Sequence, residues 1–165
     1  MSGAYDFGIV PASDIERPVL IAYDGSDFAK AAIAAAANQL GPARKAVVVT
    51  VWEPLDLKWA ANLGNPALHA EAYKTVGNEA RVAAERLAET GAELASEAGF
   101  DVRSELVDGS PAWQRIVEAA EKLDAGLIVL GSCGRTGLSY VLLGSVATAV
   151  ARHSKRPVFI AHDKS

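Results

Sequence analysis

Short apolar runs alternate along the chain with longer stretches in which apolar residues recur at helical spacing. Five of the runs are rich in β-branched residues and have the length of buried strands. The third run alternates only partly between polar and apolar positions. We therefore predict five strands, at residues 18–23, 46–52, 100–107, 125–130 and 157–161.

The stretches between these runs predict helices. Ser26 has the side chain of a helix N-cap, Asp27 suits a first turn, and Gly41-Pro42 ends the first helix. Ser110 and Pro111 predict the start of another helix, with Ser110 as N-cap and Pro111 as first helical residue. The last helix is expected over residues 145–154.

Residues 67–98 predict one long helix, or two helices with a break, because Gly77 and Gly91 weaken the helical pattern. Glutamates spaced four residues apart, from Glu85 to Glu97, predict a solvated face. The opposite stripe is predicted to be buried, and its members are Val76, Ala80, Ala83, Leu87, Leu94 and Ala98.

Alternating strands and helices predict an α/β fold with an open, doubly wound parallel sheet and helices on both faces. If the winding reverses after the third strand, the strand order is 3-2-1-4-5. Ligands bind such sheets at the carboxyl ends of the two strands that flank the reversal. Here those ends are Asp24-Gly25-Ser26 and the segment from Gly131 onward.

The length of 165 residues suits one domain, which we place at residues 17–165, after a loose leader at residues 1–16. No linker or internal repeat divides it. Residues 53–66 form an irregular stretch of the length of a lid or binding loop. We expect this stretch to be the element that moves on binding, with Trp59 as a lid residue.

Composition narrows the function classes. A net charge of −4 and the lack of a Lys/Arg cluster argue against nucleic-acid binding. The single cysteine, Cys133, excludes an intramolecular disulfide and favours a reducing cytosol; we read it as a packed or partly exposed thiol. We see no signal peptide and no apolar stretch that could cross a bilayer, so we expect a cytoplasmic protein without membrane contact.

The segment from Gly131 to Ser145 carries the candidate chemistry. Its glycines let main-chain amides approach an anion, and the helix that begins near Ser145 directs further amides and the positive end of its dipole at the same place. Phosphate could be held there without a cluster of lysines. The sequence has no G-x-x-x-x-G-K-[ST] and no G-x-G-x-x-G after the first strand, which excludes a P-loop and counts against a dinucleotide fold. A plain surface loop remains the alternative.

Three segments together resemble the universal stress protein family. They are VLIAYDGSDFAKAAI near residue 20, the pattern G-x-x-G-(nine residues)-G-S, and the closing RPVFIAH. Gly131, Gly134, Gly144 and Ser145 match the glycine pattern that ATP-binding members of this family keep. The resemblance covers residues 18–162.

The resemblance implies a set of binding residues. Asp24, preceded by Ala22 and Tyr23, would contact the adenine or the ribose. Val51 and Leu130 would line the adenine slot. The remaining residues would surround the ribose and the phosphates: Gly131, Ser132, Gly134, Arg135, Gly144, Ser145, Val146 and Ala147.

The expected function is that of a dimeric, ATP-binding stress-response protein that takes part in nucleotide sensing or signalling. ATP is the expected ligand, with or without Mg²⁺, and hydrolysis is expected to be slow or absent because no Walker-type lysine or acidic metal pair is evident. The alternatives are a nucleotide-free dimeric interaction module and an ATP pyrophosphatase-like enzyme, although Asp24-Gly25-Ser26-Asp27 departs from the Ser-Gly-Gly-x-Asp-Ser turn of such enzymes. The apolar last strand, at the sheet edge, predicts a homodimer through that edge.

Overall fold

The computed structural model describes residues 16–53, 66–133 and 143–162 of the chain. Its core is a single five-stranded parallel sheet with strand order β3-β2-β1-β4-β5, as the sequence predicted. The strands are β1 (Val19–Ala22), β2 (Lys45–Trp52), β3 (Asp101–Asp108), β4 (Leu127–Gly131) and β5 (Val158–Ala161).

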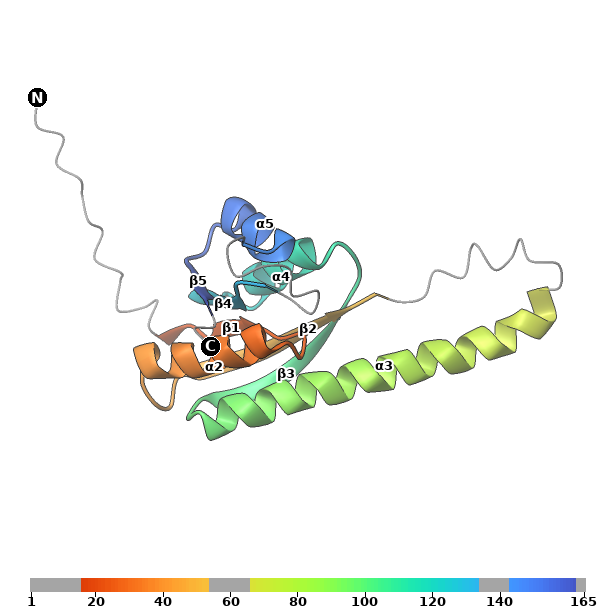
Figure 1. The fold of residues 1–165 in the computed structure, drawn as a ribbon, viewed down its shortest axis with the longest axis horizontal. Helices are drawn as coiled ribbons and strands as arrows, with labels where there is room; N and C mark the ends of the chain where they lie inside the picture. The colour runs from red at the N-terminus through yellow and green to blue at the C-terminus, as the bar shows by residue number, and fades with distance from the viewer. Residues whose placement is uncertain (1–15, 54–65, 134–142, 163–165) are drawn as a thin grey trace, which may run out of the picture.

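Helices cover both faces of the sheet, with two on each side (Figure 1). Helices α2 (Asp27–Leu40) and α3 (Pro66–Glu97) pack on one face. Helices α4 (Ala112–Lys122) and α5 (Ser145–His153) pack on the other. This arrangement confirms the doubly wound α/β fold.

Strand β1 lies at the centre and shows why both faces must be covered. Val19, Ile21 and Tyr23 face the α2 and α3 side, whereas Leu20 and Ala22 face the α4 and α5 side. Successive side chains of a strand point to opposite faces. An apolar run without polar positions is therefore stable only between two layers.

The first predicted helix is confirmed together with both of its ends. The Ser26 hydroxyl accepts a hydrogen bond from the Ala29 amide at 3.1 Å, which caps α2. The helix ends at Gly41, whose φ of 78° suits a residue without a Cβ.

The predicted cap of α4 is wrong. The N-cap is Pro111, one residue later than predicted, and no side chain caps the helix. With φ −76° and ψ 150°, Pro111 is still extended, so it cannot be the first helical residue. Ser110 therefore lies outside the helix.

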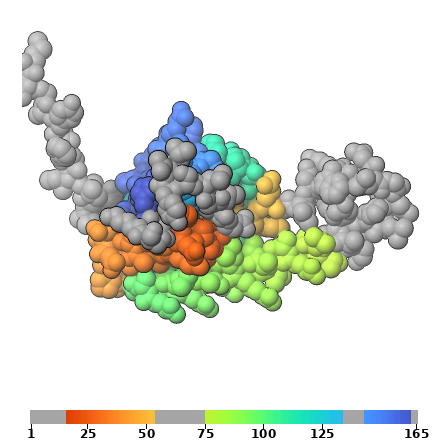
Figure 2. Space-filling model, viewed as in Figure 1, coloured from red at the N-terminus to blue at the C-terminus, as the bar shows by residue number. Residues whose placement is uncertain are grey.

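Helix α3 is one unbroken helix of 32 residues, and its first half extends past the sheet (Figures 1 and 2). The predicted buried stripe is therefore only partly correct. Leu87, Leu94 and Ala98 pack against the core. Three other members, Val76, Ala80 and Ala83, are exposed because no described strand lies beneath them.

Helix α3 lies very close to the sheet at Gly91. A Cβ on this residue would lie 2.6 Å from Cδ1 of Tyr23 and 2.9 Å from Cγ1 of Val48, closer than side chains pack. Both neighbours are buried core residues. The glycine that weakens the helix locally is therefore what lets the helix reach the sheet.

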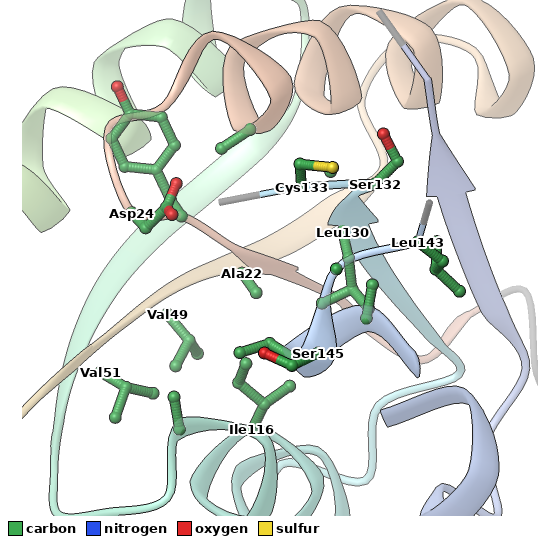
Figure 3. A pocket seen from close by; sticks show the side chains of 17 residues that line it. Ala22, Asp24, Val49, Val51, Ile116, Leu130, Ser132, Cys133, Leu143 and Ser145 are labelled. Carbon is green, nitrogen blue, oxygen red and sulfur yellow. The ribbon is translucent and has the colours of Figure 1, made fainter. Parts of the chain in front are cut away.

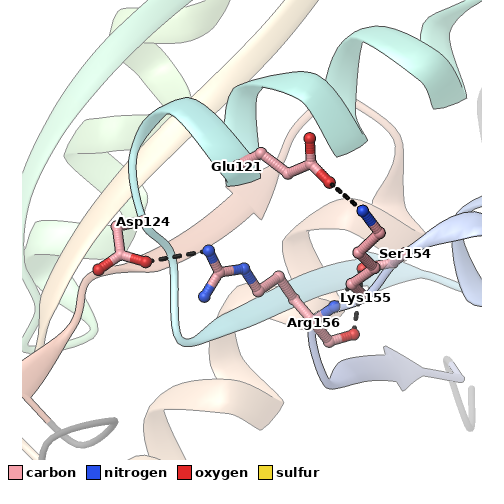
Figure 4. Close-up of polar contacts among 5 residues, drawn as sticks. All are labelled: Glu121, Asp124, Ser154, Lys155 and Arg156. Atoms are coloured by element: carbon pink, nitrogen blue, oxygen red, sulfur yellow. Dashed lines mark hydrogen bonds and ion pairs between the residues drawn. The ribbon is translucent and has the colours of Figure 1, made fainter.

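Ion pairs and hydrogen bonds join the loops at the amino end of the sheet (Figure 4). Asp124 accepts a hydrogen bond from Arg156 at 2.9 Å and forms an ion pair with Arg17 at 3.2 Å. Lys155 lies 3.8 Å from Glu121. Exposed pairs of this kind contribute about 0–1 kcal/mol each, so the apolar layers carry most of the stability.

The contact at Gly91 makes a stability prediction with a matched control. We expect Gly91→Ala to lower the free energy of unfolding by about 1–3 kcal/mol, because the added methyl group must displace core side chains. Gly77 lies in the same helix, and a Cβ added there would have nothing within 4 Å of it. Gly77→Ala should be neutral or stabilising by up to about 1 kcal/mol. Urea unfolding measures both, and equal effects would contradict the packing argument.

Candidate nucleotide pocket

A cavity of about 530 Å³ opens at the carboxyl ends of β1, β2 and β4, where the winding of the sheet reverses (Figure 3). Its volume lies in the range of about 300–1,000 Å³ typical of small-molecule sites. Residues from β1, β2, β4, α2, α4 and α5 line it. They are Ala22, Tyr23, Asp24, Ala29, Val49, Val51, Ala112, Ile116, Leu130, Gly131, Ser132, Cys133, Leu143, Gly144, Ser145, Val146 and Ala147.

One end of the pocket is aliphatic. Val49 and Val51 lie two residues apart on β2, so the strand presents both to the same side. Figure 3 shows them beside Ile116 of α4, with Leu130 of β4 farther along the pocket wall. Such a surface suits a flat apolar group, and no charged side chain lies among these four.

Asp24 follows β1 at the rim of the pocket, in a turn that holds its carboxylate in place. One carboxylate oxygen, Oδ1, accepts a hydrogen bond from the Ser26 amide at 3.0 Å. Gly25, between them, has a φ of 83°, a conformation that favours glycine. The same turn therefore positions the Asp24 carboxylate and leads into the capped start of α2.

Tyr23 lines the pocket, but its ring belongs to the other face of the sheet, where it meets Gly91. Its main chain is bound to β2: the Tyr23 amide donates to the Val49 carbonyl at 2.9 Å, and the Thr50 hydroxyl donates to the Tyr23 carbonyl at 2.9 Å. Burial raises the pKa of the Tyr23 hydroxyl above its ordinary value.

The other end of the pocket is polar and is formed by the start of α5. Gly144 is the N-cap, and no side chain caps the helix. The amides of Ser145, Val146 and Ala147 lie in the first turn, where amides have no partner within the helix. Together with the helix dipole they favour an anion at this end.

The strand end and the helix start are tied together at Ser132. The Gly144 amide donates to the Ser132 carbonyl at 2.7 Å, and the Ser132 amide donates to the Ala161 carbonyl of β5 at 2.8 Å. Ser132 is buried. These bonds hold the start of α5 beside the end of β4, although residues 134–142 lie outside the described part of the chain.

Gly131 has a packing role that sequence analysis did not foresee. A Cβ on Gly131 would lie 2.6 Å from the carbonyl carbon of Phe28 and 2.7 Å from its oxygen, both in the main chain of α2. The start of α2 thus rests directly on the end of β4. Main-chain atoms within a helix cannot move aside as the tip of a side chain can.

Every predicted binding residue that the structure describes lies on the pocket wall. These are Ala22, Tyr23, Asp24, Val51, Leu130, Gly131, Ser132, Gly144, Ser145, Val146 and Ala147. Gly134 and Arg135 lie outside the described residues, as does most of the predicted moving loop with Trp59. The geometry brings the residues together, and their contacts with a ligand remain a prediction.

Six lining residues were not predicted as binding residues. Val49 could have been found from Val51, because residues two apart share a face of a strand. Cys133, read as a packed or partly exposed thiol, is half-buried on the pocket wall. Leu143 directly precedes Gly144 and could have been found from it. The sequence offered no signal for the others, which are Ala29, Ala112 and Ile116.

Metal-binding clusters and membrane-spanning helices are both absent from the described residues. Within these residues, no three His, Cys, Asp or Glu side chains gather in a way that could hold a metal ion. No helix in the described part of the chain has the length and apolar character needed to span a membrane.

The chain is similar to known proteins over most of its length. The model of the family described as "Universal stress protein family" matches residues 16–162. A universal stress protein of Thermus aquaticus is 33% identical over 146 residues, which covers 87% of this chain and 97% of that protein. Universal stress protein MJ0531 of Methanocaldococcus jannaschii is 40% identical over 97 residues, but the match covers 59% of this chain and only 52% of that protein.

The fold is also similar to solved structures. A crystal structure described as a universal stress protein in complex with cAMP has 27% sequence identity and a TM-score of 0.60. The match covers 90% of this chain and 98% of that one.

The close packing at Gly131 predicts that this residue matters even without a ligand. We expect Gly131→Ala to lower the free energy of unfolding by about 1–3 kcal/mol in nucleotide-free protein, because the start of α2 must move off β4. Urea unfolding after removal of bound small molecules measures this. Unchanged stability would show that Gly131 is there for a ligand alone.

Proposed function

Because the chain belongs to the universal stress protein family, we propose that its pocket binds adenine nucleotide, with ATP as the principal ligand. The bound nucleotide acts as a signal in a stress response, and hydrolysis is slow or absent. The observation that carries this proposal is a pocket with an aliphatic end and an amide-lined end, at the reversal point of the sheet.

The two ends of the pocket match the two ends of a nucleotide. The base would lie among Ala22, Val51 and Leu130, where its flat apolar surface replaces water. The phosphates would lie at the start of α5, where the amides of residues 145–147 donate to phosphate oxygens. The hydroxyl of Ser145 is available to the same oxygens.

The position of Asp24 supports one orientation of the nucleotide. A carboxylate repels phosphate groups, so Asp24 belongs beside the base or the ribose, where it can accept hydrogen bonds. Its fixed oxygen, held by the Ser26 amide, keeps the carboxylate at the rim. This places the phosphates away from β1 and toward α5.

A relative supports the choice of ligand. The universal stress protein solved in complex with cAMP shares 27% of its sequence and its fold with this chain. Cyclic AMP contains the adenine, ribose and phosphate that the two ends of the pocket suit. ATP has the same adenine and ribose and a longer phosphate chain, and the amides at the start of α5 would bind that chain.

Nucleotide binding is proposed without efficient turnover. The sequence has no Walker-type lysine, and the turn after β1 differs from that of the ATP pyrophosphatase-like enzymes. Binding transmits a signal only if ATP prefers one of two conformations.

We expect incubation with ATP to release neither phosphate nor pyrophosphate at a catalytic rate, as measured by product analysis. Rapid release of pyrophosphate would favour the ATP pyrophosphatase-like enzyme instead.

The phosphate end is tested by placing a charge at the start of α5. We expect purified protein, freed of bound nucleotide, to bind ATP in calorimetric titration and Gly144→Glu to bind at least about tenfold more weakly, because its carboxylate repels the phosphates. The extended backbone at Gly144 accepts a side chain, and a carboxylate at a helix start is not destabilising.

A matched control introduces the same charge elsewhere. Val82 is 43% exposed on α3 and does not line the pocket. Val82→Glu should bind ATP as the parent protein does. No binding by the parent protein would overturn the proposal and favour a nucleotide-free interaction module.

The orientation is tested at Asp24. We expect Asp24→Asn to weaken the binding of adenosine and ATP by a similar factor of about three to thirty, since a hydrogen bond to a charged group contributes roughly 1.5–3 kcal/mol and the amide replaces only part of it. Asparagine keeps an oxygen for the Ser26 amide. Tighter binding of ATP by this variant would show that Asp24 faces the phosphates instead.

We also propose that the protein is a homodimer formed through β5. In the sheet, β5 is an edge strand, and Val158, Phe159 and Ile160 are only half-buried. A second copy would cover both the unpaired edge and these side chains. Light scattering at micromolar concentration should report a dimer, and a monomer would contradict the proposal.

A further inference from the structure

Helix α4 supplies one wall of the aliphatic end of the pocket, and no binding residue expected from the sequence lies on it. Ala112 and Ile116 both line the cavity and are one helical turn apart, so they share a face of α4. Ile116 is 4% exposed and points from α4 toward the cavity (Figure 3). What these two side chains do for a ligand depends on where the helix begins.

The start of α4 is fixed relative to the end of β2. Val51 pairs with Val107 and Trp52 pairs with Asp108 in the register of β2 and β3. The Gly109 amide then donates to the Trp52 carbonyl at 2.9 Å.

Only two residues separate Gly109 from Ala112, the first residue of α4. Because this connection is short, the start of α4 stays close to the end of β2, and α4 packs on that strand. Ala112, at the start of α4, therefore lies at the same end of the pocket as Val51.

We propose that Ala112 determines the size of the base that the pocket accepts, as the wall that faces Val51 across the base slot. This inference rests on the proposed binding of adenine nucleotide. Ala112 has the smallest side chain that still has a Cβ, and it is half-buried. A purine fits the slot because position 112 contributes only a methyl group there.

The chemistry of the surrounding residues favours the base over the phosphates at this end. Val49, Val51 and Ile116 carry no polar side-chain atom, so a charged phosphate would lose its hydration without compensation. The phosphates are instead expected at the start of α5, where main-chain amides replace the lost hydration. A side chain added at residue 112 therefore competes with the base alone.

The test enlarges residue 112 and compares ligands that share the base but differ in phosphate number. We expect Ala112→Leu to weaken the binding of ATP, ADP and adenosine by the same factor, at least about tenfold, because each must displace the new side chain. Glu118→Leu places the same side chain on the exposed side of α4, away from the pocket wall, and should bind all three within about twofold of the parent protein. Calorimetric titration measures the affinities, and circular dichroism with thermal melting confirms that each variant is folded.

Each outcome has one meaning. If the parent protein binds ATP and folded Ala112→Leu binds it equally well, Ala112 is not a wall of the base slot. A loss confined to ATP and ADP, with adenosine unaffected, would place the phosphates at α4 and also overturn the inference. If the parent protein binds none of the three ligands, the proposed function itself fails.

A second variant covers the case in which Ala112→Leu does not fold. Val51→Phe narrows the same slot from the β2 side, and Val51 is only half-buried. It should produce the same uniform weakening across the three ligands. A folded Val51→Phe variant with parental affinity for adenosine would contradict the slot between β2 and α4.

Discussion

The pocket exists because the two neighbouring strands β1 and β4 send their helices to opposite faces of the sheet. After β1 the chain turns to α2 on one face, and after β4 it continues to α5 on the other. Helices that depart to opposite faces leave a space between the two strand ends. The other lining elements, β2 and α4, are positioned by their own pairing and packing around that space.

Glycine controls the distances between layers at two places. At Gly131 the missing Cβ lets the main chain of α2 rest on the end of β4, and at Gly91 it lets α3 approach Tyr23. The contact at Gly91 acts on the β1 end of the pocket, because Tyr23 directly precedes Asp24. In this fold, a residue that the sequence assigns to ligand binding also sets how closely the layers pack.

The pocket divides into two chemical environments that come from different kinds of structure. The aliphatic end is formed by side chains of strands and of α4, which are buried in the same cluster as the core on that face. The polar end is formed by main-chain amides at the start of α5, which need no charged side chain to attract an anion. An acidic protein with a net charge of −4 can therefore offer a site for phosphate.

The sequence by itself determined the elements that depend only on residues close together in the chain. The apolar runs identified the strands, Ser26 and Gly41 marked the ends of α2, and the glycine pattern located the start of α5. The strand order followed from the further assumption that the winding reverses after the third strand. The exposure of Val76 was decided only by the tertiary structure, because a helical stripe has the same spacing whether or not a sheet lies beneath it. The same holds for Ala112 and Ile116, which reach the pocket through layer packing across residues far apart in the chain. Spacing along the chain encodes which face a side chain occupies, but only the assembled layers decide what that face meets.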